Sequence, residues 1–338
     1  MKLGFWKKLK KPFFCLAPMA DVTDAAFRQI IAKYGKPDVF WTEFVSADGL
    51  ASIGKKKLLI DLKFSKNEHP IVAQIFGSKT ENIKKASALI AKLGFDGIDI
   101  NMGCPDKTIE KQGAGALLIK NHKLAAQIIE AAKQGAPGLP ISVKTRIGYS
   151  KNEINTWIKF LLKMNLPVLT VHLRTRKELS KVPAHWDLMK KIVALKNRIS
   201  PKTLIIGNGD VIDIDDGRRK CKESGCDGIM IGRGIFGNPF LFANLARDLS
   251  DGQIERPAEA LAKGDNIPLL QEKLQVMVEH TKLFEKLFSK YKNFAIMKKH
   301  FKAYVNGFDG AKELRTKLME TKNASEVDKI VQEFVSTL

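Results

Sequence analysis

The chain has 338 residues, of which 44% are apolar, a composition that excludes a disordered chain and allows one large α/β domain with a smaller one after it. Lys and Arg number 57 against 36 Asp and Glu, and the net charge of +21 favours a polyanionic partner, although a solvated lysine surface is the plainer explanation. Four cysteines without CxxC spacing disfavour a zinc site and a disulfide framework, and no apolar run is long enough to cross a membrane, so we expect a metal-free cytoplasmic protein.

Short apolar, β-rich runs alternate with longer helical patterns along most of the chain. The expected strands are 13–17, 39–44, 71–76, 97–100, 141–145, 168–171, 203–207 and 228–231. The expected helices between and after them are 23–34, 80–93, 122–134, 153–164, 184–195, 215–223 and 238–249. Because this alternation is typical of a parallel sheet, the eight repeats predict an α/β fold of the closed (β/α)8 TIM-barrel type rather than an open doubly wound sheet.

Polar or turn-forming residues follow the end of every predicted strand. They are Pro18-Met19, Glu43, Gln74, Asn101, Lys144 with Arg146, His172 with Arg174, Asn208 with Asp210, and Gly232-Arg233. The active sites of such barrels are built from the carboxyl ends of the strands, so we expect these side chains to converge.

The fourth predicted strand and the loop after it carry the candidate reactive residue. Strand parity places Asp99 and Asn101 on one face and the neighbouring isoleucines on the other, so isoleucines packed under helices would turn the polar pair into a central cavity. Cys104 follows on a loop in which Gly113 and Gly115 are candidate hinges of a lid. The alternative is that Cys104 is a small buried apolar residue.

Two glycine-rich turns follow the seventh and eighth predicted strands. The turns 207–209 and 232–234 predict a phosphate site built from backbone N–H groups, with Arg233 as its charge partner. The segment 232–237 also matches GxGxxG, but no convincing strand follows it, so a dinucleotide fingerprint is disfavoured.

A change in composition divides the chain. We expect a barrel domain over 1–249, a linker or insertion over 250–268, and a helical domain over 269–338. Helical periodicity in the last part is found at 270–288, 294–305, 311–320 and 325–335. Ser325 and Asp328 are the expected cap of the last helix.

One segment of the helical domain mixes cations with aromatic residues. Lys298, Lys299 and Lys302 alternate with Phe301 and Tyr304, as they do on surfaces that face RNA. In the alternative interpretation, the two aromatic residues belong to the core and only the lysines are solvated.

The chain carries a series of short motifs in a fixed order. In chain order they are APMADVTD (17–24) with Phe27-Arg28, TE (42–43), VAQIFG (72–77), NMGCP (101–105), SVKTR (142–146), VHLRT (171–175), NGD (208–210) and GRG (232–234). Over nearly its whole length the chain resembles the flavin-dependent tRNA-dihydrouridine synthases. The opening motif and the helix with Lys298, His300 and Tyr304 are most similar to the bacterial B-type branch, whereas Asp21 and the long 250–268 insertion depart from the pattern.

The resemblance implies FMN across the barrel mouth and tRNA as the partner of a monomeric protein. The cofactor-binding residues that it implies are Pro18, Met19, Ala20, Gln74, Lys144, His172, Asn208, Gly209, Asp210, Gly232 and Arg233. Asn101 and Arg174 are the candidates for holding uracil, and Lys298, Lys299 and Lys302 for contacting tRNA.

The implied reaction is reduction of the uracil C5–C6 bond. Hydride would pass from FMN N5 to C6 after FMN is reduced by NADPH or NADH, and Cys104 would donate the proton to C5. A thiol with an ordinary pKa of about 8.5 is protonated at neutral pH and still acidic enough to donate. Because a stacked uridine cannot reach a barrel mouth, the base must be extruded.

Two other hypotheses stay open. A flavin barrel that reduces a free pyrimidine needs no basic helical domain, and activity on free uracil without tRNA would favour it. A non-catalytic RNA-binding barrel would keep Cys104 for packing alone, and a colourless purified protein would favour that hypothesis.

Overall fold

The computed structural model describes residues 1–246 and 267–338, so the predicted linker lies outside the described residues over 250–266. The chain separates into two compact units. The first unit comprises Met1–Met19, Asp38–Lys63 and His69–Gly232. The second comprises Ala20–Pro37, Phe64–Glu68 and the described part of Arg233–Leu338. Each unit is described by itself below.

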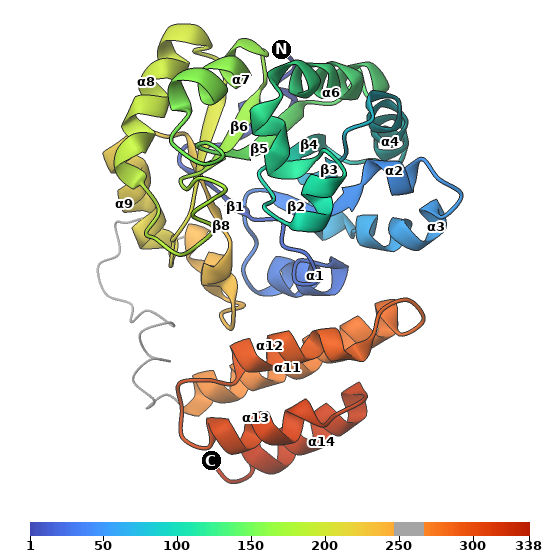
Figure 1. Cartoon of the computed structure of the whole chain (residues 1–338). Coiled ribbons are helices and arrows are strands. Elements are labelled where there is room, and N and C mark those ends of the chain that lie inside the picture. The colour runs from blue at the N-terminus through green and yellow to red at the C-terminus, as the bar shows by residue number, and fades with distance from the viewer. Residues whose placement is uncertain (247–266) are drawn as a thin grey trace. The chain divides into compact units, whose positions relative to one another are not determined.

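The first unit is built on an 8-stranded parallel sheet with the order β1-β8-β7-β6-β5-β4-β3-β2 (Figure 1). The strands are β1 (Phe13–Leu16), β2 (Phe40–Ser46), β3 (Ile71–Phe76), β4 (Gly97–Met102), β5 (Ile141–Arg146), β6 (Val168–His172), β7 (Leu204–Asn208) and β8 (Gly228–Ile231). All eight expected strands are present, and the prediction of an α/β barrel followed by helices is confirmed.

The barrel closes between β1 and β2 through a short parallel contact. Cys15 and Val39 form an isolated bridge, and the backbone N–H of Leu16 donates to the Val39 carbonyl at 3.2 Å. Asp38 completes the junction, because its backbone N–H donates to the Phe14 carbonyl at 2.9 Å while its carboxylate accepts from Phe14 N at 2.7 Å. These bonds satisfy backbone groups that an open edge would leave exposed.

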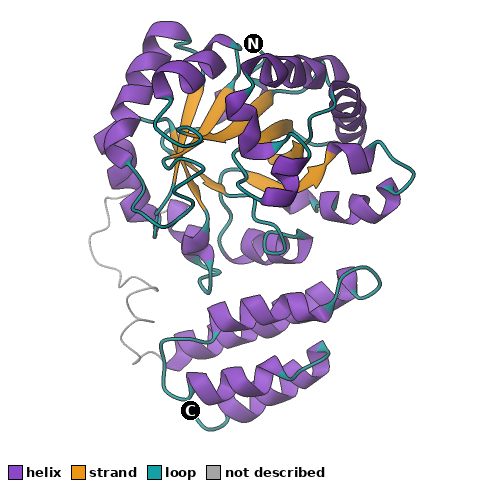
Figure 2. Cartoon of the chain, in the orientation of Figure 1, coloured by secondary structure: helices purple, strands orange, loops and turns teal. Residues whose placement is uncertain are grey.

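The helices alternate with the strands and lie outside them (Figure 2). The helices of the first unit are α2 (Ala47–Leu50), α3 (Lys55–Leu58), α4 (Thr80–Lys92), α5 (Lys107–Lys111), α6 (His122–Gly135), α7 (Lys159–Lys163), α8 (Met189–Ile199) and α9 (Ile214–Ser224). Those of the second unit are α1 (Ala25–Tyr34), α11 (Ile267–Phe288), α12 (Met297–Tyr304), α13 (Ala311–Met319) and α14 (Ala324–Val335).

Three expected helices differ from the prediction in how they begin or how far they extend. The helix predicted at 153–164 starts as a π-helical turn over Ile154–Ile158, and the one predicted at 184–195 starts as a 3-10 turn over Trp186–Leu188. In place of 238–249 there is a 3-10 segment over Leu241–Ala246, and the rest of that prediction lies outside the described residues.

The cap predicted for the last helix was wrong. Asn323, rather than Ser325, caps α14, because its side chain accepts from the backbone N–H of Glu326 at 2.9 Å. The Glu326 carboxylate accepts in turn from Asn323 Nδ2 and from Lys322 N, each at 2.7 Å. The segment Asn-x-x-Glu at 323–326 resembles a capping box. Its first residue stands two positions before Ser325, the predicted cap.

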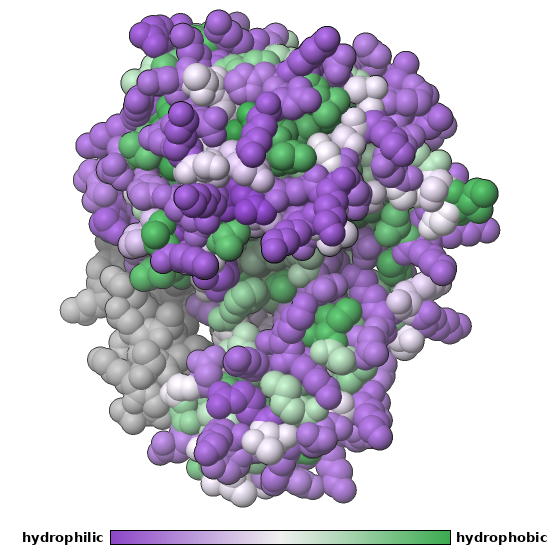
Figure 3. Space-filling model, in the orientation of Figure 1, coloured by the Kyte–Doolittle hydropathy of each residue, from purple (hydrophilic) through white to green (hydrophobic). Residues whose placement is uncertain are grey.

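The barrel interior has an apolar half. Its inward-facing residues form one cluster, and Trp6 from the 3-10 segment Gly4–Lys8 packs into that cluster. The buried members are Trp6, Phe13, Cys15, Ala17, Val39, Trp41, Val72, Val168, Leu204, Ile206 and Met230. This filled core leaves the carboxyl ends of the strands as the place for polar side chains. The surface in Figure 3 is largely hydrophilic, in keeping with the 57 Lys and Arg residues.

The second unit packs α1 against α11 and α12 around buried aromatic and histidine rings. Phe27, His280 and His300 form a triangle of rings, with centroid distances of 5.6 Å and 5.3 Å from Phe27 to the two histidines and 4.6 Å between the histidines. Arg28 forms a fully buried ion pair with Glu68 at 2.6 Å. Such a pair is held by its geometry, and removing one partner leaves an uncompensated buried charge.

We predict that the second unit loses stability in mild acid. Burial and the neighbouring Lys299 lower the pKa of His300 to about 3, and burial and His300 lower the pKa of His280 well below its ordinary value. Below about pH 6.5 the unfolded chain therefore binds protons that the folded chain does not. For each of the two histidines, the free energy of unfolding falls by about 1.4 kcal/mol per pH unit. Urea unfolding followed by circular dichroism should show this loss between pH 7 and 5.

The variant His280→Met isolates the effect from the titration of carboxylates. Its loss of unfolding free energy between pH 7 and 5 should be about 2 kcal/mol smaller than that of the wild type. Equal losses in the two proteins would contradict the assignment of the pH dependence to this pair.

Candidate active site at the carboxyl ends of the strands

Polar side chains line the inner face at the carboxyl ends of β3 to β7. The register pairs Gln74 with Asp99, Asn101 with Lys144, and His172 with Asn208. Paired residues of parallel strands point to the same side of the sheet, so these side chains form one continuous polar layer. The expected convergence at this edge is therefore found.

A chain of buried hydrogen bonds crosses this layer from β5 to β3 and back to β4. The carboxylate of Asp99 accepts from Ser142 Oγ at 2.5 Å and from Gln74 Nε2 at 2.7 Å. Gln74 Oε1 in turn accepts from Asn101 Nδ2 at 3.0 Å. Asn101 Oδ1 then accepts from the backbone N–H of Cys104 at 2.9 Å. The acceptor-only carboxylate thus fixes the orientation of both amides and, through them, the start of the cysteine loop.

The parity argument for Asp99 and Asn101 is confirmed, and it leads to a role for Asn101 that the sequence did not indicate. Both side chains are buried on the inner face. Because both polar atoms of the Asn101 amide already bind protein groups, its contribution in this structure is to hold the Cys104 loop. Its contact with uracil remains a prediction.

The Cys104 loop is fixed rather than open. Arg146 Nε donates to the Gly103 carbonyl at 2.8 Å, and Ala116 N donates to the Cys104 carbonyl at 2.9 Å. Gly115 has φ +63°, and a Cβ added there would lie 2.8 Å from the Cys104 carbonyl oxygen. Gly115 therefore serves a close approach, since no other residue fits this turn without strain, and these contacts favour a rigid loop over the expected hinge.

The Cys104 side chain lies at the edge of an apolar cluster. It packs against Phe76, Ile109 and Ala114, and is itself only partly buried. Burial raises the pKa of the Cys104 thiol, while the backbone N–H of Asp106 acts in the opposite direction. At neutral pH this side chain is a thiol that carries its proton.

Lys144 brings a positive charge into the same layer. Its Nζ donates to Asn208 Oδ1 at 3.1 Å, and among the described residues no carboxylate forms an ion pair with it. Burial and the nearby Arg146 lower the pKa of Lys144 to about 8, whereas Asp99 raises it. On the neighbouring strand the buried hydroxyl of Thr170 has no hydrogen-bond partner. An anionic group with an acceptor would satisfy both side chains.

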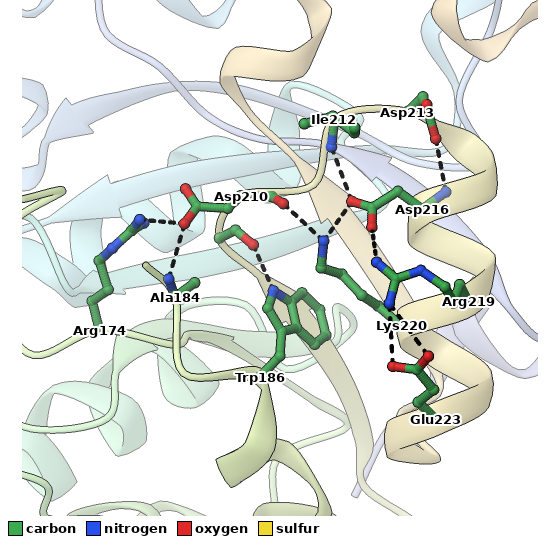
Figure 4. Close-up of polar contacts among 11 residues, drawn as sticks. Arg174, Ala184, Trp186, Asp210, Ile212, Asp213, Asp216, Arg219, Lys220 and Glu223 are labelled. Atoms are coloured by element: carbon green, nitrogen blue, oxygen red, sulfur yellow. Dashed lines mark hydrogen bonds and ion pairs between the residues drawn. The ribbon is translucent and has the colours of Figure 1, made fainter. Parts of the chain in front are cut away.

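The turn after β7 is held from several sides (Figure 4). Arg174 forms an ion pair with Asp210, whose carboxylate also accepts from Ala184 N at 2.9 Å. Trp186 Nε1 donates to the Gly209 carbonyl at 2.7 Å, while Lys220 Nζ donates to the Asp210 carbonyl at 2.9 Å. Lys220 belongs to a cluster on α9 whose members are Asp216, Arg219 and Glu223. The carboxylate of Asp210 thus braces the turn, and Trp186 and Lys220 fix its backbone carbonyls.

Glycine is required at position 209 itself. Its φ is +122°, and a Cβ would lie 2.9 Å from Ala184 Cβ and 3.0 Å from His172 Cδ2. His172 is thereby placed beside the turn, and its Nε2 lies 3.2 Å from Arg174 Nη1. Arg174 Nε also donates to the Val182 carbonyl at 2.6 Å, so its guanidinium is bound within the protein. Its contact with uracil stays a prediction.

The ends of β1 and β8 leave room beside the turn. A Cβ at Gly232 would meet only Ala17 Cβ and Met19 Sδ, both at 3.7 Å, and Pro18 is buried next to them. Ala20 and Arg233 belong to the second unit and are exposed. The structure thus brings most of the predicted cofactor-binding residues to one edge of the barrel, and these two are described apart from it.

The basic helix α12 separates its cations from its aromatic residues. Phe301 and Tyr304 are buried, whereas Lys299 and Lys302 are exposed and Lys298 is half-buried. The aromatic residues are therefore core, as in the alternative interpretation, and cannot stack on RNA bases. The lysines form a basic stripe that faces solvent.

Sequence reasoning missed the residues that support the site. Ser142 was not singled out, although it stands two residues before Lys144 and strand parity alone could have placed it on the inner face; Arg146 was expected at this edge, but its bond to the Gly103 carbonyl was not. Trp186 and Lys220 lie on elements far from the turn in sequence and carried no signal of their contact with it.

The residues that the structure describes contain neither a group of metal ligands nor a membrane-spanning helix. Over 1–246 and 267–338, no three His, Cys, Asp or Glu side chains are grouped as a metal ion would require. Within the same ranges no helix combines the length and the apolarity needed to span a bilayer.

Comparison with known proteins gives consistent matches. A family model described as "Dihydrouridine synthase (Dus)" matches residues 15–338. A "Probable tRNA-dihydrouridine synthase" of Staphylococcus aureus strain Mu50 is 42% identical over 337 residues, covering 99% of this chain and 96% of the relative. A "Probable tRNA-dihydrouridine synthase 2" of Bacillus subtilis strain 168 is 41% identical over 336 residues, with coverages of 99% and 97%.

Solved structures of similar fold are more distant. A 2-naphthoyl-CoA reductase complex matches with TM-score 0.53 and 11% identity, covering 72% of this chain and 51% of that one. Histamine dehydrogenase from Rhizobium sp. 4-9 matches with TM-score 0.51 and 14% identity, covering 78% and 49%. At these identities the likeness supports the barrel fold alone.

We predict that Asp99→Asn loosens the cysteine loop. An asparagine turns one of the two accepting oxygens into an NH2 group, and its remaining neutral oxygen accepts a weaker hydrogen bond from Gln74 than the charged carboxylate does. The free energy of unfolding should fall by about 1–3 kcal/mol, and alkylation of Cys104 by iodoacetamide should become faster. Mass spectrometry of the modified peptide measures that rate.

The matched control is Ser142→Ala, which removes one donor and leaves the Gln74 contact in place. It should change stability without changing the alkylation rate. Equal alkylation rates in the wild type and Asp99→Asn would show that the loop does not depend on this carboxylate.

Proposed function

Because the chain belongs to the dihydrouridine synthase family, we propose that it is an oxidoreductase that reduces the C5–C6 double bond of specific uridines in tRNA. The observation that carries the proposal is the Cys104 thiol, on a loop hydrogen-bonded to Asn101 and Arg146, at the same barrel edge as the half-buried Lys144. A proton donor and a fixed positive charge are the two protein groups that such a reduction needs.

The proposed cofactor is FMN, and the residues at the barrel mouth fit it. Lys144 lacks a carboxylate partner among the described residues and Thr170 has an unpartnered hydroxyl, so an anionic ring edge with acceptors suits both. The space beside Gly232 and the turn at Gly209 suit a phosphate bound by backbone N–H groups. Pro18 and Met19 would border the flavin ring, and Gln74 and His172 would contact the ring from the strand ends.

Each protein group then has one task. FMN, once reduced by NADPH or NADH, would supply a hydride to C6 of uracil. Cys104 would give its proton to C5, because burial keeps the thiol protonated at neutral pH. The hydrogen bond from Cys104 N to Asn101 would hold the loop so that the thiol stays aimed at one face of the base.

Recognition of tRNA would depend on charge and shape. The target uridine must leave its stack to reach the barrel mouth, which costs a few kcal/mol that phosphate contacts have to offset. The lysine stripe of α12 and the net charge of +21 would supply such contacts. The same excess of charge disfavours the alternative of a free pyrimidine as substrate.

The direct test is to incubate the purified protein with NADPH and unmodified tRNA and to map dihydrouridine by mass spectrometry. Flavin absorbance in the protein and dihydrouridine at defined positions are expected. Reduction of free uracil at a comparable rate would support a small-molecule reductase, and a colourless protein that binds tRNA would support a non-catalytic barrel.

We predict that Cys104→Ala separates the two halves of the reaction. The variant should keep the yellow flavin and its bleaching by NADPH, because Cys104 is not needed for either. The yield of dihydrouridine per unit time should fall by about 10²–10⁴-fold, the usual contribution of a general acid. Stopped-flow absorbance measures the first step and tRNA digestion with mass spectrometry the second; an unchanged rate on tRNA would refute the assignment of Cys104.

We also predict that replacing Lys298, Lys299 and Lys302 with Gln weakens tRNA binding. Loss of two or three phosphate contacts should lower affinity about tenfold at moderate salt and flatten the dependence of log Kd on log salt. Fluorescence anisotropy at several salt concentrations measures both, and the flavin spectrum should not change.

A control of equal charge loss is available on α4. Lys84, Lys85 and Lys92 are exposed there, and their replacement with Gln removes the same charge from another surface. If both triple variants lose the same affinity, the effect is one of net charge and α12 has no special role.

A further inference from the structure

Two cysteines that have no part in the proposed reaction lie in contact with each other. Cys221 is in the last turn of α9 and Cys226 directly precedes β8. Their Sγ atoms are 3.5 Å apart, and Cys221 Sγ donates to the Cys226 carbonyl at 2.9 Å. Cys15 is buried in the barrel interior and Cys104 packs against the cluster of Phe76, Ile109 and Ala114, so both lie apart from this pair.

The turn between the two cysteines is what brings the sulfur atoms together. Gly225 ends α9 in the left-handed region, with φ +74°, and its N–H donates to the Cys221 carbonyl at 2.8 Å. This reversal folds the chain back so that a residue on the helix meets one five positions later. A residue with a side chain would be strained at this φ, so the pairing depends on the glycine.

The pair lies at the end of the barrel opposite to Cys104. Cys226 and Asp227 precede β8, and the Asp227 carboxylate holds this end by pairing with Lys11 at 2.5 Å and accepting from Ile205 N at 2.8 Å. Both thiols are buried, but the turn that covers them is exposed at Lys222, Glu223 and Gly225.

We propose that Cys221 and Cys226 form a reversible disulfide, which makes this helix–strand turn a modification site for oxidants of the peroxide class. The sulfur atoms must approach each other by about 1.5 Å to reach a normal S–S bond length, a shift within the range of side-chain rotation. The site is independent of the flavin and of tRNA, so it does not rest on the proposed function.

Oxidation of the pair by hydrogen peroxide takes two steps. The Cys226 thiolate attacks one oxygen of hydrogen peroxide, the O–O bond breaks, and a sulfenic acid and hydroxide form. Cys221 sulfur then displaces the sulfenic oxygen, the S–S bond forms, and its proton leaves with that oxygen as water. The contact between the two sulfur atoms at 3.5 Å lowers the pKa of Cys226 and raises that of Cys221, so we assign the first attack to Cys226.

The test uses the full-length wild-type protein. It is treated with hydrogen peroxide, its free thiols are blocked with N-ethylmaleimide, and the non-reduced peptides are analysed by mass spectrometry. We expect a cross-link between Cys221 and Cys226, a loss of two alkylated thiols with a mass decrease of two hydrogen atoms, and full recovery after dithiothreitol.

Matched variants assign the roles within the pair. Cys226→Ser should abolish oxidation at this site, whereas Cys221→Ser should leave Cys226 as a sulfenic acid that a dimedone probe traps. Cys15→Ser, which changes an equally buried thiol elsewhere in the barrel, should leave the cross-link unaffected. Sulfinic acid at either cysteine of the wild type without a cross-link, bridges to another cysteine, or no oxidation at peroxide levels that modify Cys104 would each overturn the proposal.

Discussion

The candidate site depends on one buried carboxylate. Asp99 is fully enclosed at the centre of the polar layer, and it can only accept hydrogen bonds while ionised. Burial raises its pKa to about 6, and the hydrogen bonds from Ser142 and Gln74, with the charge of Lys144, act against that rise. Because the carboxylate determines which end of each amide faces which neighbour, it helps to position the backbone of the Cys104 loop through Gln74 on β3 and Asn101 on β4.

The two ends of the barrel interior differ: one is apolar and contributes to stability, and the other carries the candidate site. One end is closed by packed apolar side chains around Trp6, and the other carries polar side chains that are hydrogen-bonded to one another. Polar groups on a rigid strand end keep their positions better than groups on a free loop, and here even the reactive loop is tied to the strands through Arg146 and Asn101. The site is therefore largely formed before any ligand binds.

The second unit has a different physical character. Its core buries several polar atoms that have no hydrogen-bond partner. They are both ring nitrogens of His280, Nε2 of His300 and the hydroxyl of Tyr304. Such burial is costly and is compensated by close ring packing around Phe27 and by the Arg28–Glu68 pair. The lysines of α12 remain outside this core, where Lys299 pairs with Asp21 at 3.3 Å and Lys302 is exposed.

The sequence by itself determined the barrel, because strand and helix periods are local patterns: all eight strands were found, and 71–76 and 228–231 were bounded correctly. It also brought Gln74, Cys104, Lys144 and His172 to one edge through the rule for carboxyl ends of strands. Only the tertiary structure decided that Asn101 and Arg174 hold protein groups, that Asn323 caps the last helix, and that Cys221 meets Cys226. These outcomes depend on distances between side chains from different elements, which no periodicity along the chain records.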